Sequence, residues 1–431
     1  MSCRRLFLIL ASLVGTGTLH AQAEVTGFAR NYLGLTPIDG PEWRVARTTL
    51  RLDTDLRLTS VRLFGSVQAD ENRIQHALDA RLTVREVYAD ARTGPIDLRL
   101  GRFLHTFGRS DGVILSDVFS SYDLSEFLTQ DPTDLKRAID GLRLSAQFGA
   151  NSIQLLASPF KPVSSLPKGD WSVADEAVNG IPVSTLSGGN KALDPGPMRA
   201  ALLLSLRPTL DWDVDLAVGH WSYPVDSYAK TLEFMSMGPF TFPTRVNLEN
   251  RTSHSVLAIL STEYRATPIL GLTAEAAWWM DRETDILPTD PSKLETENPN
   301  RFLRSAPFVQ TLFGAKTVWM GINASAQVFA EHFLREPESM MADRTVVGGS
   351  FSLFRRFWYD DLTLRLFTRI QHDPSGFWAN PEALYRVSDS VQLRLGGHHF
   401  GGPIQSANDP TFSFSQYRPN SFLYTKLAYY W

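Results

Sequence analysis

Apolar and polar residues alternate along most of this chain, and this period of two constrains its fold more than any other feature. From Leu50 to Leu58, leucines take every second position except 54, and arginines and aspartates lie between them. Residues 362–370 repeat the pattern, with leucines opposed to Arg365 and Arg369. Because successive side chains of a strand point to opposite faces, each segment predicts a strand with one apolar and one polar face.

About eighteen such segments follow one another along the chain. The predicted strands cover residues 24–34, 43–58, 60–70, 80–93, 95–105, 138–147, 150–158, 197–207, 210–221, 252–264, 268–280, 305–316, 318–331, 343–355, 358–370, 379–388, 391–400 and 420–431. Sixteen strands is the alternative, because 24–34 and 379–388 are weakly patterned. The second of these contains Pro381, which cannot donate a hydrogen bond to a sheet.

The connections between these segments are short and long in turn. After even-numbered strands only one to three residues intervene, around positions such as Thr93-Gly94 and Ser388-Asp389. After odd-numbered strands the connections are longer, near 106–137, 159–196, 222–251, 281–304, 332–342 and 401–419. Short periplasmic turns and long extracellular loops are typical of outer-membrane barrels. A β-sandwich or a β-propeller gives no reason for loop length to alternate in this way.

The two faces of the strands agree with a barrel. Polar residues in every strand are costly in a packed core, but not in a water-filled lumen. A closed barrel also satisfies every backbone group in lipid. The sequence therefore predicts an all-β fold, a transmembrane antiparallel up-and-down β-barrel, as a single domain over 24–431. An even number of strands places both chain ends on the periplasmic side.

The last strand ends on Tyr429-Tyr430-Trp431, whereas chain ends are usually polar and frayed. Leu423, Leu427 and Tyr429 share one face, which is predicted to meet lipid, and Lys426 lies on the other. Trp and Tyr gather at membrane–water interfaces, so Trp431 is expected at the periplasmic interface. A terminal aromatic on an alternating strand also resembles the signal by which bacterial outer-membrane proteins engage the barrel insertion machinery.

The first residues indicate secretion. Arg4 and Arg5 precede an apolar run from Leu6 to Leu19 and an A-x-A site at Ala21 to Ala23, which together predict a signal peptide over 1–23. Its removal takes away the one cysteine, Cys3, and moves the formal net charge from −4 to −6. A disulfide framework and general nucleic-acid binding are thereby excluded. The remainder has no eighteen-residue apolar stretch, which excludes a helical membrane protein.

The polar faces of the strands carry many arginines, since only eight of the 42 basic residues are lysines. The predicted pore-lining cations are Arg51, Arg57, Arg62, Arg99, Arg143, Arg365, Arg369, Arg394 and Lys426. A guanidinium holds carboxylate, sulfate or phosphate, so a series of them would pass an anion from site to site. A second interpretation stays open, in which lumen acids such as Asp53, Asp55, Asp97, Glu275 and Glu331 pair with these arginines and stiffen the wall.

One long connection, residues 106–137, is acidic and moderately apolar. Its predicted acidic groups are Asp111, Asp117, Asp123, Glu126, Asp131 and Asp134, and Ser121 to Leu128 has the pattern of a short helix. In general porins the loop at this position folds into the pore. If it does so here, its carboxylates face the wall arginines and narrow the channel. The alternative is a surface loop held by its own salt bridges.

Enzyme motifs do not occur in the sequence. It has no G-x-S-x-G, no H-E-x-x-H and no phosphate-binding glycine loop. His398 and His399 are adjacent on a strand and point to opposite faces, so they would not hold one metal together. We therefore expect no catalytic residues, no metal and no cofactor.

Two short motifs resemble a known family. Residues 100–112, L-G-R-F-L-H-T-F-G-R-S-D-G, and residues 85–90, R-E-V-Y-A-D, are similar to patterns of the alginate-export family and related uncharacterised outer-membrane proteins. The resemblance implies an eighteen-stranded barrel with an arginine-rich pore. It does not transfer a substrate, because fold and function vary separately.

The sequence thus predicts a porin-like outer-membrane channel for passive diffusion or export of small or oligomeric anionic solutes. Its expected partners are outer-membrane lipid, an anionic solute or oligosaccharide, and the insertion machinery. The alternatives are an adhesin or structural barrel that works through its surface loops and, less favoured, an outer-membrane enzyme.

Overall fold

The computed structural model describes most of the chain from Gln22 to Trp431. The described residues are 22–37, 40–74, 77–109, 115–160, 164–165, 171, 177–178, 181–186, 195–223, 227–237, 240–251, 254–285, 303–335, 344–372, 375–403 and 413–431. The predicted signal peptide lies almost wholly outside them, as does Asp111.

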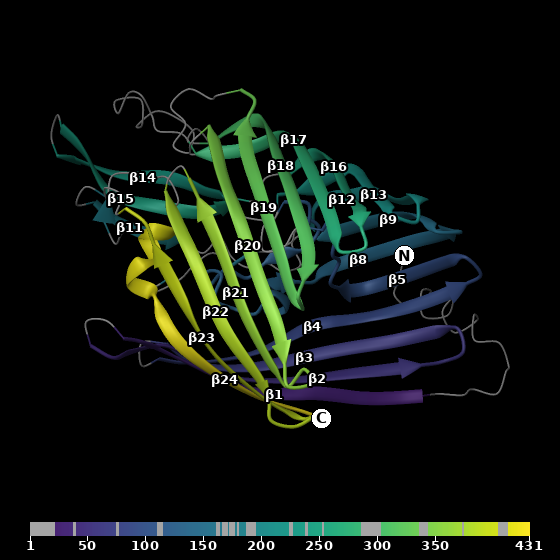
Figure 1. Cartoon of the computed structure of the whole chain (residues 1–431). Coiled ribbons are helices and arrows are strands. Elements are labelled where there is room, and N and C mark those ends of the chain that lie inside the picture. The colour runs from purple at the N-terminus through teal and green to yellow at the C-terminus, as the bar shows by residue number, and fades with distance from the viewer. Residues whose placement is uncertain are drawn as a thin grey trace.

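Eighteen antiparallel strands form one closed sheet, with β1 paired to both β2 and β24 (Figure 1). These strands are β1 (Gln22–Thr36), β2 (Glu42–Arg57), β3 (Val61–Ile74), β4 (Ala77–Thr93), β5 (Ile96–Phe103), β8 (Ile139–Phe148), β9 (Asn151–Phe160), β12 (Pro195–Thr209), β13 (Trp212–Ser222), β16 (His254–Thr267), β17 (Leu270–Asp285), β18 (Leu303–Trp319), β19 (Ile322–Phe333), β20 (Thr345–Phe357), β21 (Leu362–Gln371), β22 (Gly376–Arg386), β23 (Val391–Gly401) and β24 (Phe422–Tyr430). The predicted barrel of eighteen strands is confirmed, and the alternative of sixteen is wrong.

Connection length differs between the two ends of the barrel as the sequence predicts, except that β3–β4 and β21–β22 at the loop end are joined by only two and four residues. At one end of the barrel, the turn end, successive barrel strands are joined by two to four residues, as at 94–95 and 358–361. At the other end, the loop end, long connections include 104–138, 161–194 and 402–421. Both ends of the described chain lie at the turn end, because Phe28 near the start of β1 pairs with Tyr430.

Side chains alternate between the two faces of the wall. On β24, Leu423, Leu427 and Tyr429 are more than half exposed on the outer face, while Lys426 between them is buried inside. On β19, Val328 is 60% exposed and Gln327 beside it is 3% exposed. The outer surface is therefore apolar and the inner one polar, as the period of two requires.

The weakly patterned segment around Pro381 is a full strand, β22. Pro381 lies on β22 opposite Leu366 of β21, and the ladder from β22 to β23 lacks partners for residues 380 and 381. There the Asn380 side-chain amide donates to the Gly397 carbonyl at 2.9 Å. The proline is tolerated because the ladder is interrupted where its N–H is missing.

The closing seam between β1 and β24 is dense in aromatic rings. Phe28 lies 5.8 Å from Tyr430, and Tyr32 meets Tyr424 edge-on at 5.5 Å. Trp431 extends the pairing, because its backbone exchanges two hydrogen bonds with Gly27. A Cβ at Gly27 would lie 2.8 Å from the Trp431 ring, so glycine provides the space for the last residue.

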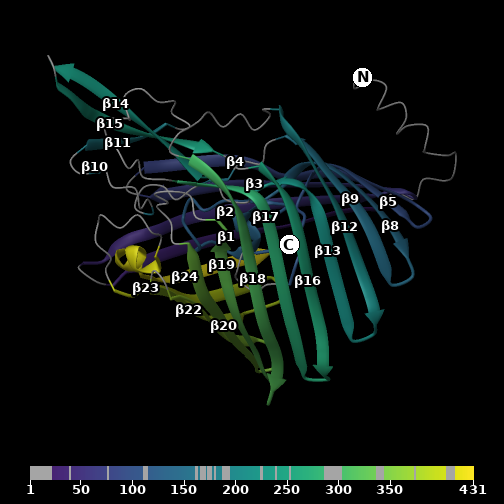
Figure 2. The ribbon, with the colours of Figure 1, turned by 90° about the horizontal axis from the view of Figure 1, so that it is seen from above.

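Smaller elements occur in the long connections. β10 (Ala177–Val178), β11 (Ile181–Leu186), β14 (Ser227–Met237) and β15 (Phe240–Arg251) form a separate four-stranded sheet, and Figure 2 shows β14 and β15 projecting past the wall. A 3₁₀ helix, η4 (Phe414–Asn420), precedes the last strand. The sequence predicted only loops in these places. No helix in the described ranges is long and apolar enough to cross a membrane.

A charge on the outer face is expected to oppose folding into lipid. Val328→Arg places a guanidinium in the apolar belt, which should cost roughly 2–4 kcal/mol near the bilayer midplane. Urea-induced unfolding in lipid vesicles, followed by tryptophan fluorescence, measures the loss.

The matched control is Ser325→Arg, on the inner face of the same strand. It should unfold within about 1 kcal/mol of the unaltered protein, since surface-type changes are usually small. Equal loss in both variants would contradict the assignment of the two faces.

Candidate functional site

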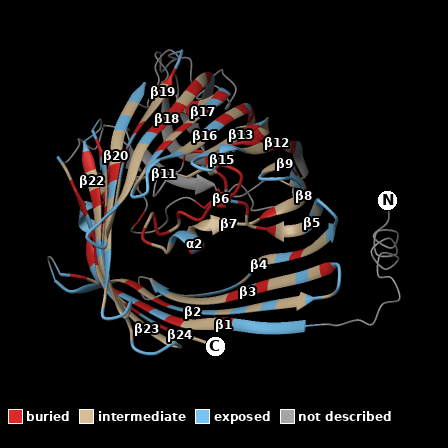
Figure 3. Cartoon of the chain, turned by 45° about the vertical axis from the view of Figure 1, so that its right-hand side comes forward, coloured by how far each residue is buried: buried red, intermediate tan, exposed pale blue. Residues whose placement is uncertain are grey.

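The described residues of the connection from β5 to β8, 104–109 and 115–138, lie inside the ring of strands (Figure 3). It carries β6 (Ser121–Tyr122), β7 (Lys136–Arg137), which pairs with β6, and the one-turn helix α2 (Pro132–Leu135). Proline opens α2, where its missing N–H costs nothing. The helix expected over Ser121–Leu128 is wrong, because residues 121 and 122 are used in pairing and Asp123 forms a bridge to Ser165.

Apolar contacts hold both halves of this loop to the barrel. In the first half, Phe119 packs edge-on against Trp221 of β13 at 5.1 Å and is fully buried. In the second half, Phe127 stacks on Tyr417 of η4 at 4.0 Å. Edge-on and offset ring pairs add to the free energy gained from burial alone. The loop therefore bridges two separate parts of the wall.

Acidic groups of the loop bind cations on the wall from β1 to β4. Glu126 accepts from Arg47 and from Asn72, both at 2.9 Å. Asp134 accepts from Arg51 at 2.5 Å and also from Arg30. Burial by itself would raise the pKa of the Asp134 carboxyl, but Arg30 and Arg51 outweigh it and lower that pKa.

Asp131 binds cations on three strands around the closing seam. Its carboxylate lies 2.6 Å from Arg30 of β1, 2.7 Å from Lys426 of β24 and 3.5 Å from Arg394 of β23. Burial would raise the pKa of the Asp131 carboxyl, but the charges of Lys426, Arg30 and Arg394 hold it well below its usual range. This carboxylate stays ionised at any ordinary pH.

The start of the loop binds the opposite wall. Arg109 pairs with Asp215 of β13 at 2.8 Å and with Glu263 of β16 at 3.2 Å. Ser116 donates to Glu275 of β17 at 2.6 Å. The loop is thus held by ionic contacts on both sides of the lumen, with the charges reversed between the two sides.

The remaining loop acids that the structure describes, Asp117 and Asp123, pair within the loop, and Asp123 also lies 3.5 Å from Arg81 of β4. Asp117 binds Lys136, and Asp123 lies 2.6 Å from Arg137. Burial would raise the pKa of the Asp123 carboxyl, but Arg137 outweighs burial and lowers it to about 2. His105, at the start of the loop, is 7% exposed. Burial lowers the pKa of its imidazole to about 4, with help from the Arg143 charge, so this ring is neutral.

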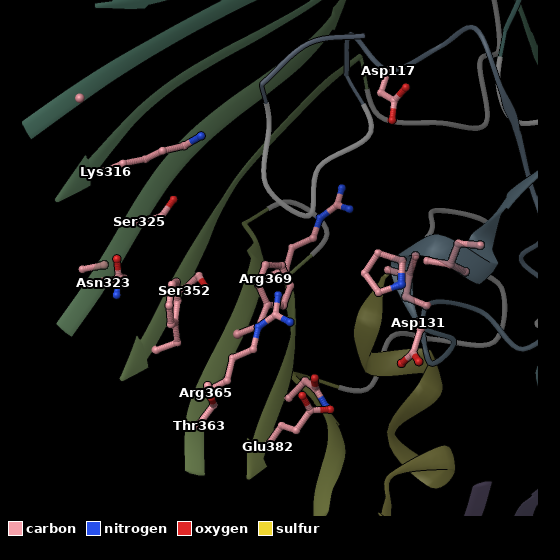
Figure 4. A pocket seen from close by; sticks show the side chains of 18 of the residues that line it. Asp117, Asp131, Lys316, Asn323, Ser325, Ser352, Thr363, Arg365, Arg369 and Glu382 are labelled. Carbon is pink, nitrogen blue, oxygen red and sulfur yellow. The ribbon is translucent and has the colours of Figure 1, made fainter. Parts of the chain in front are cut away.

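A cavity of about 940 Å³ remains between the loop and the inner wall from β16 to β24 (Figure 4). Its basic lining residues are Lys136, Arg265, Lys316, Arg356, Arg365, Arg369, Arg394 and Lys426. Its acidic lining residues are Asp117, Asp131, Glu263 and Glu382. Eight basic groups against four acidic ones give the cavity a net positive charge, in a chain whose formal charge is negative.

Each of the four acids already has a partner. Asp117 binds Lys136, Asp131 binds Lys426 and Glu263 binds Arg109, while Glu382 accepts from the Tyr424 hydroxyl at 2.9 Å. By contrast, Arg365 is exposed to the cavity and has no ion pair with any described residue. The guanidinium of Arg369 lies over the Phe329 ring at 5.0 Å.

The nine predicted pore-lining cations fall into two groups. Arg365, Arg369, Arg394 and Lys426 lie around this cavity. The other five are on strands β2, β3, β5 and β8, outside the cavity lining, and most bind acids: Arg51 binds Asp134, Arg57 and Arg62 share Asp55, and Arg99 binds Asp90 at 2.6 Å. Arg143 lies directly opposite Arg99 in the register of β5 and β8.

Sequence reasoning missed several charged groups that organise the interior. Arg30, Arg47 and Arg85 contact the loop, and Lys316 and Glu382 line the cavity. The alternation of inward and outward side chains along their strands could have identified them, because all five occupy inward positions. In the described part of the chain, no three His, Cys, Asp or Glu residues cluster in a way that could hold a metal ion.

Solved structures provide the comparison with known proteins. The fold is similar to the crystal structures of Pseudomonas aeruginosa OccK8 (OprE), Acinetobacter baumannii OccAB3 and Pseudomonas aeruginosa OccK10 (OpdN), with TM-scores of 0.53, 0.52 and 0.51. Identities are 9%, 10% and 10%, and the matches cover 95%, 96% and 95% of this chain and 98%, 99% and 98% of those chains. These neighbours are outer-membrane porins, and at such identity the likeness establishes the fold alone.

No model of a known protein family and no curated protein matches the chain. The resemblance to the alginate-export family therefore stays a prediction, carried by the two short motifs on β4 and at the end of β5.

Removing the Asp131 charge should destabilise the protein. Asp131→Asn removes the carboxylate that binds Lys426, which is 4% exposed, while Arg30 keeps Asp134. Breaking a buried ion pair costs roughly 3–5 kcal/mol. Urea unfolding in detergent micelles measures the change. Asp361→Asn is the control, because its pair with Arg386 is half exposed and should be worth less than about 1 kcal/mol. Equal effects would show that the Asp131 contacts contribute little.

His105 should make stability depend on pH between about 6.5 and 4. Its folded pKa of about 4 lies below the unfolded value near 6.5, so the unfolded chain binds a proton first as the pH falls. Stability contributed by the neutral ring is complete above pH 6.5 and is lost progressively down to pH 4. The loss should be on the order of 3 kcal/mol.

His105→Asn should lack this part of the pH profile when both proteins are unfolded in urea at a series of pH values. Asp123, with a folded pKa of about 2, loses its contribution only below about pH 4 in either protein. Parallel profiles between pH 6.5 and 4 would rule out a buried, neutral His105.

Proposed function

We propose that this protein is a porin-like outer-membrane channel through which small anionic solutes diffuse passively. The fold it shares with outer-membrane porins supports a barrel of this class. The apolar outer face supports contact with membrane lipid, and exposed aromatics at the turn end, including Trp319, Trp358 and Trp431, suit the membrane–water interface.

One observation carries the proposed preference for anions. The cavity inside the barrel has twice as many basic as acidic lining groups, and each of the acids is already bound. An anion near Arg365 therefore meets a guanidinium that has no ion pair with any described residue, while three of the four acids are already bound to cations. Weak binding at successive sites of this kind allows a solute to enter the channel and to leave it.

The loop 106–137 is proposed to narrow the channel. Its contacts on both walls fix its place in the lumen, so solutes would pass along the cavity between the loop and strands β16 to β24. Arg51, Arg57, Arg62, Arg99 and Arg143 would then act on solutes less directly than Arg365 and Arg369. The loop acids would mainly neutralise wall cations.

The remaining partners follow from the location. A signal peptide over 1–23 would direct export, and the aromatic last strand ending in Trp431 would be bound by the barrel insertion machinery. Its pairing with β1 means that this strand also closes the wall.

Reversing one charge in the cavity should change ion selectivity. Arg365→Glu changes the cavity by two unit charges, each worth about 0.7 kcal/mol to an ion at ~6 Å in water. Cl⁻ is destabilised and K⁺ is stabilised by about 1.4 kcal/mol each, so the Cl⁻/K⁺ permeability ratio should fall roughly a hundredfold. The measurement is the reversal potential in planar bilayers across a KCl gradient.

The control is Arg386→Glu, the same charge change at the turn end, where Arg386 pairs with Asp361 and does not line the cavity. It should leave the permeability ratio close to that of the unaltered protein. An unaltered protein that conducts no ions, or prefers K⁺, would overturn the proposed function.

A further inference from the structure

Five histidines lie on the outer face of the barrel near the loop end. They share that face with exposed apolar residues of the same strands, such as Val218 on β13, Val328 on β19 and Leu395 on β23. His372 and His399 are exposed, and the other three are half-buried. The five are His220 of β13, His254 of β16, His332 of β19, His372 directly after β21, and His399 of β23. We call them the histidine arc, because β13 pairs with β16, and β19 to β23 lie side by side in the wall (Figure 1).

Each histidine ends an uncharged stretch of the outer face. On β19 the outward residues from Ile322 to Ala330 are one isoleucine, one valine and alanines, and His332 follows them. On β23 the outward residues from Val391 to Gly397 are valine, leucines and glycine before His399. On β13, β16 and β21 the corresponding stretch holds only apolar residues, aromatic residues and threonine. These five strands are described in full, and their outer faces carry no charged side chain within these stretches.

The length of the stretch matches the apolar band of an outer membrane. Ten residues separate Ile322 from His332, and ten separate Leu362 from His372. A strand rises about 3.4 Å per residue, so ten residues tilted by ~40° cover roughly 26 Å along the membrane normal. Outer-membrane barrels have an apolar band about 25 Å tall, with the long loops on the extracellular side. The histidine arc therefore lies where the hydrocarbon layer ends and the headgroups of the outer leaflet begin.

The imidazole ring suits this boundary. It has an apolar body and a polar tip, and it donates at least one N–H whether it is neutral or protonated. The Nδ1 atom of His332 lies 2.7 Å from the Thr345 hydroxyl, and this contact directs Nε2 away from that hydroxyl. The Nδ1 atom of His254 lies 2.9 Å from the Ser222 hydroxyl, and its ring stacks with that of His220 at 6.3 Å. Rings held in this way can donate to an acceptor in the headgroup layer.

Phosphate is the acceptor in that layer that such a donor binds best. Its oxygens are charged, and hydrogen bonds to a charged group are stronger than those between neutral groups. His332 and His372 belong to strands that are two apart, roughly 10 Å, so they would contact neighbouring headgroups rather than one small ion. A lipid also packs its acyl chains on the apolar stretch below each histidine, which a free phosphate ion cannot do.

We propose that the histidine arc binds the phosphate groups of lipids in the outer leaflet. The imidazole donates to the phosphate, and the acyl chains of the same lipid cover the apolar stretch between the histidine and the turn end. The site lies outside the lumen, so it goes beyond the proposed channel activity and does not depend on which solute passes through the barrel.

The test titrates the folded protein, in uncharged detergent micelles, with lipids that differ in phosphate. Native mass spectrometry counts the lipids bound to the intact protein and gives their dissociation constants. The three lipids are lipid A with two phosphates, lipid A with one phosphate, and an uncharged glycolipid with the same acyl chains. One hydrogen bond to a charged group corresponds to about tenfold in affinity, so lipid A with two phosphates should bind at least about tenfold more tightly than the uncharged glycolipid.

Three variants separate the arc from general attraction by charge. The combined changes His332→Phe, His372→Phe and His399→Phe keep a ring at each position but remove its N–H donors. They should weaken lipid A with two phosphates about tenfold. Arginine at the same three positions should bind this lipid at least as tightly as the unaltered protein does. The control is Arg355→Gln, which removes an exposed outward cation at the turn end and should change the dissociation constant less than twofold.

Each outcome supports or overturns the site. Equal binding of the three lipids by the unaltered protein would overturn it without any variant. Unchanged affinity in the phenylalanine variant, or an equal loss in Arg355→Gln, would overturn the assignment to the histidine arc. Displacement of lipid A by millimolar inorganic phosphate would show that the histidines hold a free ion, and would overturn a lipid as the occupant.

Discussion

The ionic contacts between the inward loop and the wall determine the organisation of the interior. Buried carboxylates and buried guanidinium groups are each costly unless paired. Both kinds of group are paired here. The loop carboxylates Asp131 and Asp134 bind the wall cations Arg30, Arg51 and Lys426. The loop cannot leave this position without exposing unpaired charges on two surfaces, so its place fixes where space remains for a solute.

The consequence is an unequal division of positive charge. On β1 to β4 the wall cations Arg30, Arg47 and Arg51 are neutralised by loop acids. On β21 the cation Arg365 has no described acid within ion-pair distance, and the cavity next to it is net positive. A barrel with the same wall residues but no inward loop would present the unpaired cations Arg30, Arg47 and Arg51 as well. The loop therefore confines the surface that attracts anions to one side of the lumen.

The same contacts connect the lumen with closure of the barrel. Asp131 binds residues from β1, β23 and β24, the strands on either side of the seam. Tyr32 of β1 and Tyr424 of β24 meet beneath it, and the Lys426 ammonium lies 4.3 Å from the Tyr32 ring. The loop residue Asp131 thus links the first and last strands of the barrel through its ion pairs with Arg30 and Lys426.

Much of the fold could be predicted from sequence because it depends on local rules. The period of two and the alternation of turn length located all eighteen strands, including β22 with Pro381. The ion-pair partners of the wall arginines could not be predicted, because they depend on the path of the loop through the lumen. No local pattern distinguishes Arg51, which binds Asp134, from Arg365, which binds no described acid, since both alternate with leucines. The pairing of Ser121 and Tyr122 with β7 likewise overrode their helical pattern, because a partner strand lay nearby.

The unequal division of charge can be observed directly. Crystals of the unaltered protein soaked in bromide would reveal the ion by its anomalous scattering. Bromide beside Arg365 in the cavity, with none between Arg30 and Lys426 where Asp131 already lies, is the result predicted here. Bromide at the Asp131 position, or a cavity without bromide near Arg365, would contradict it.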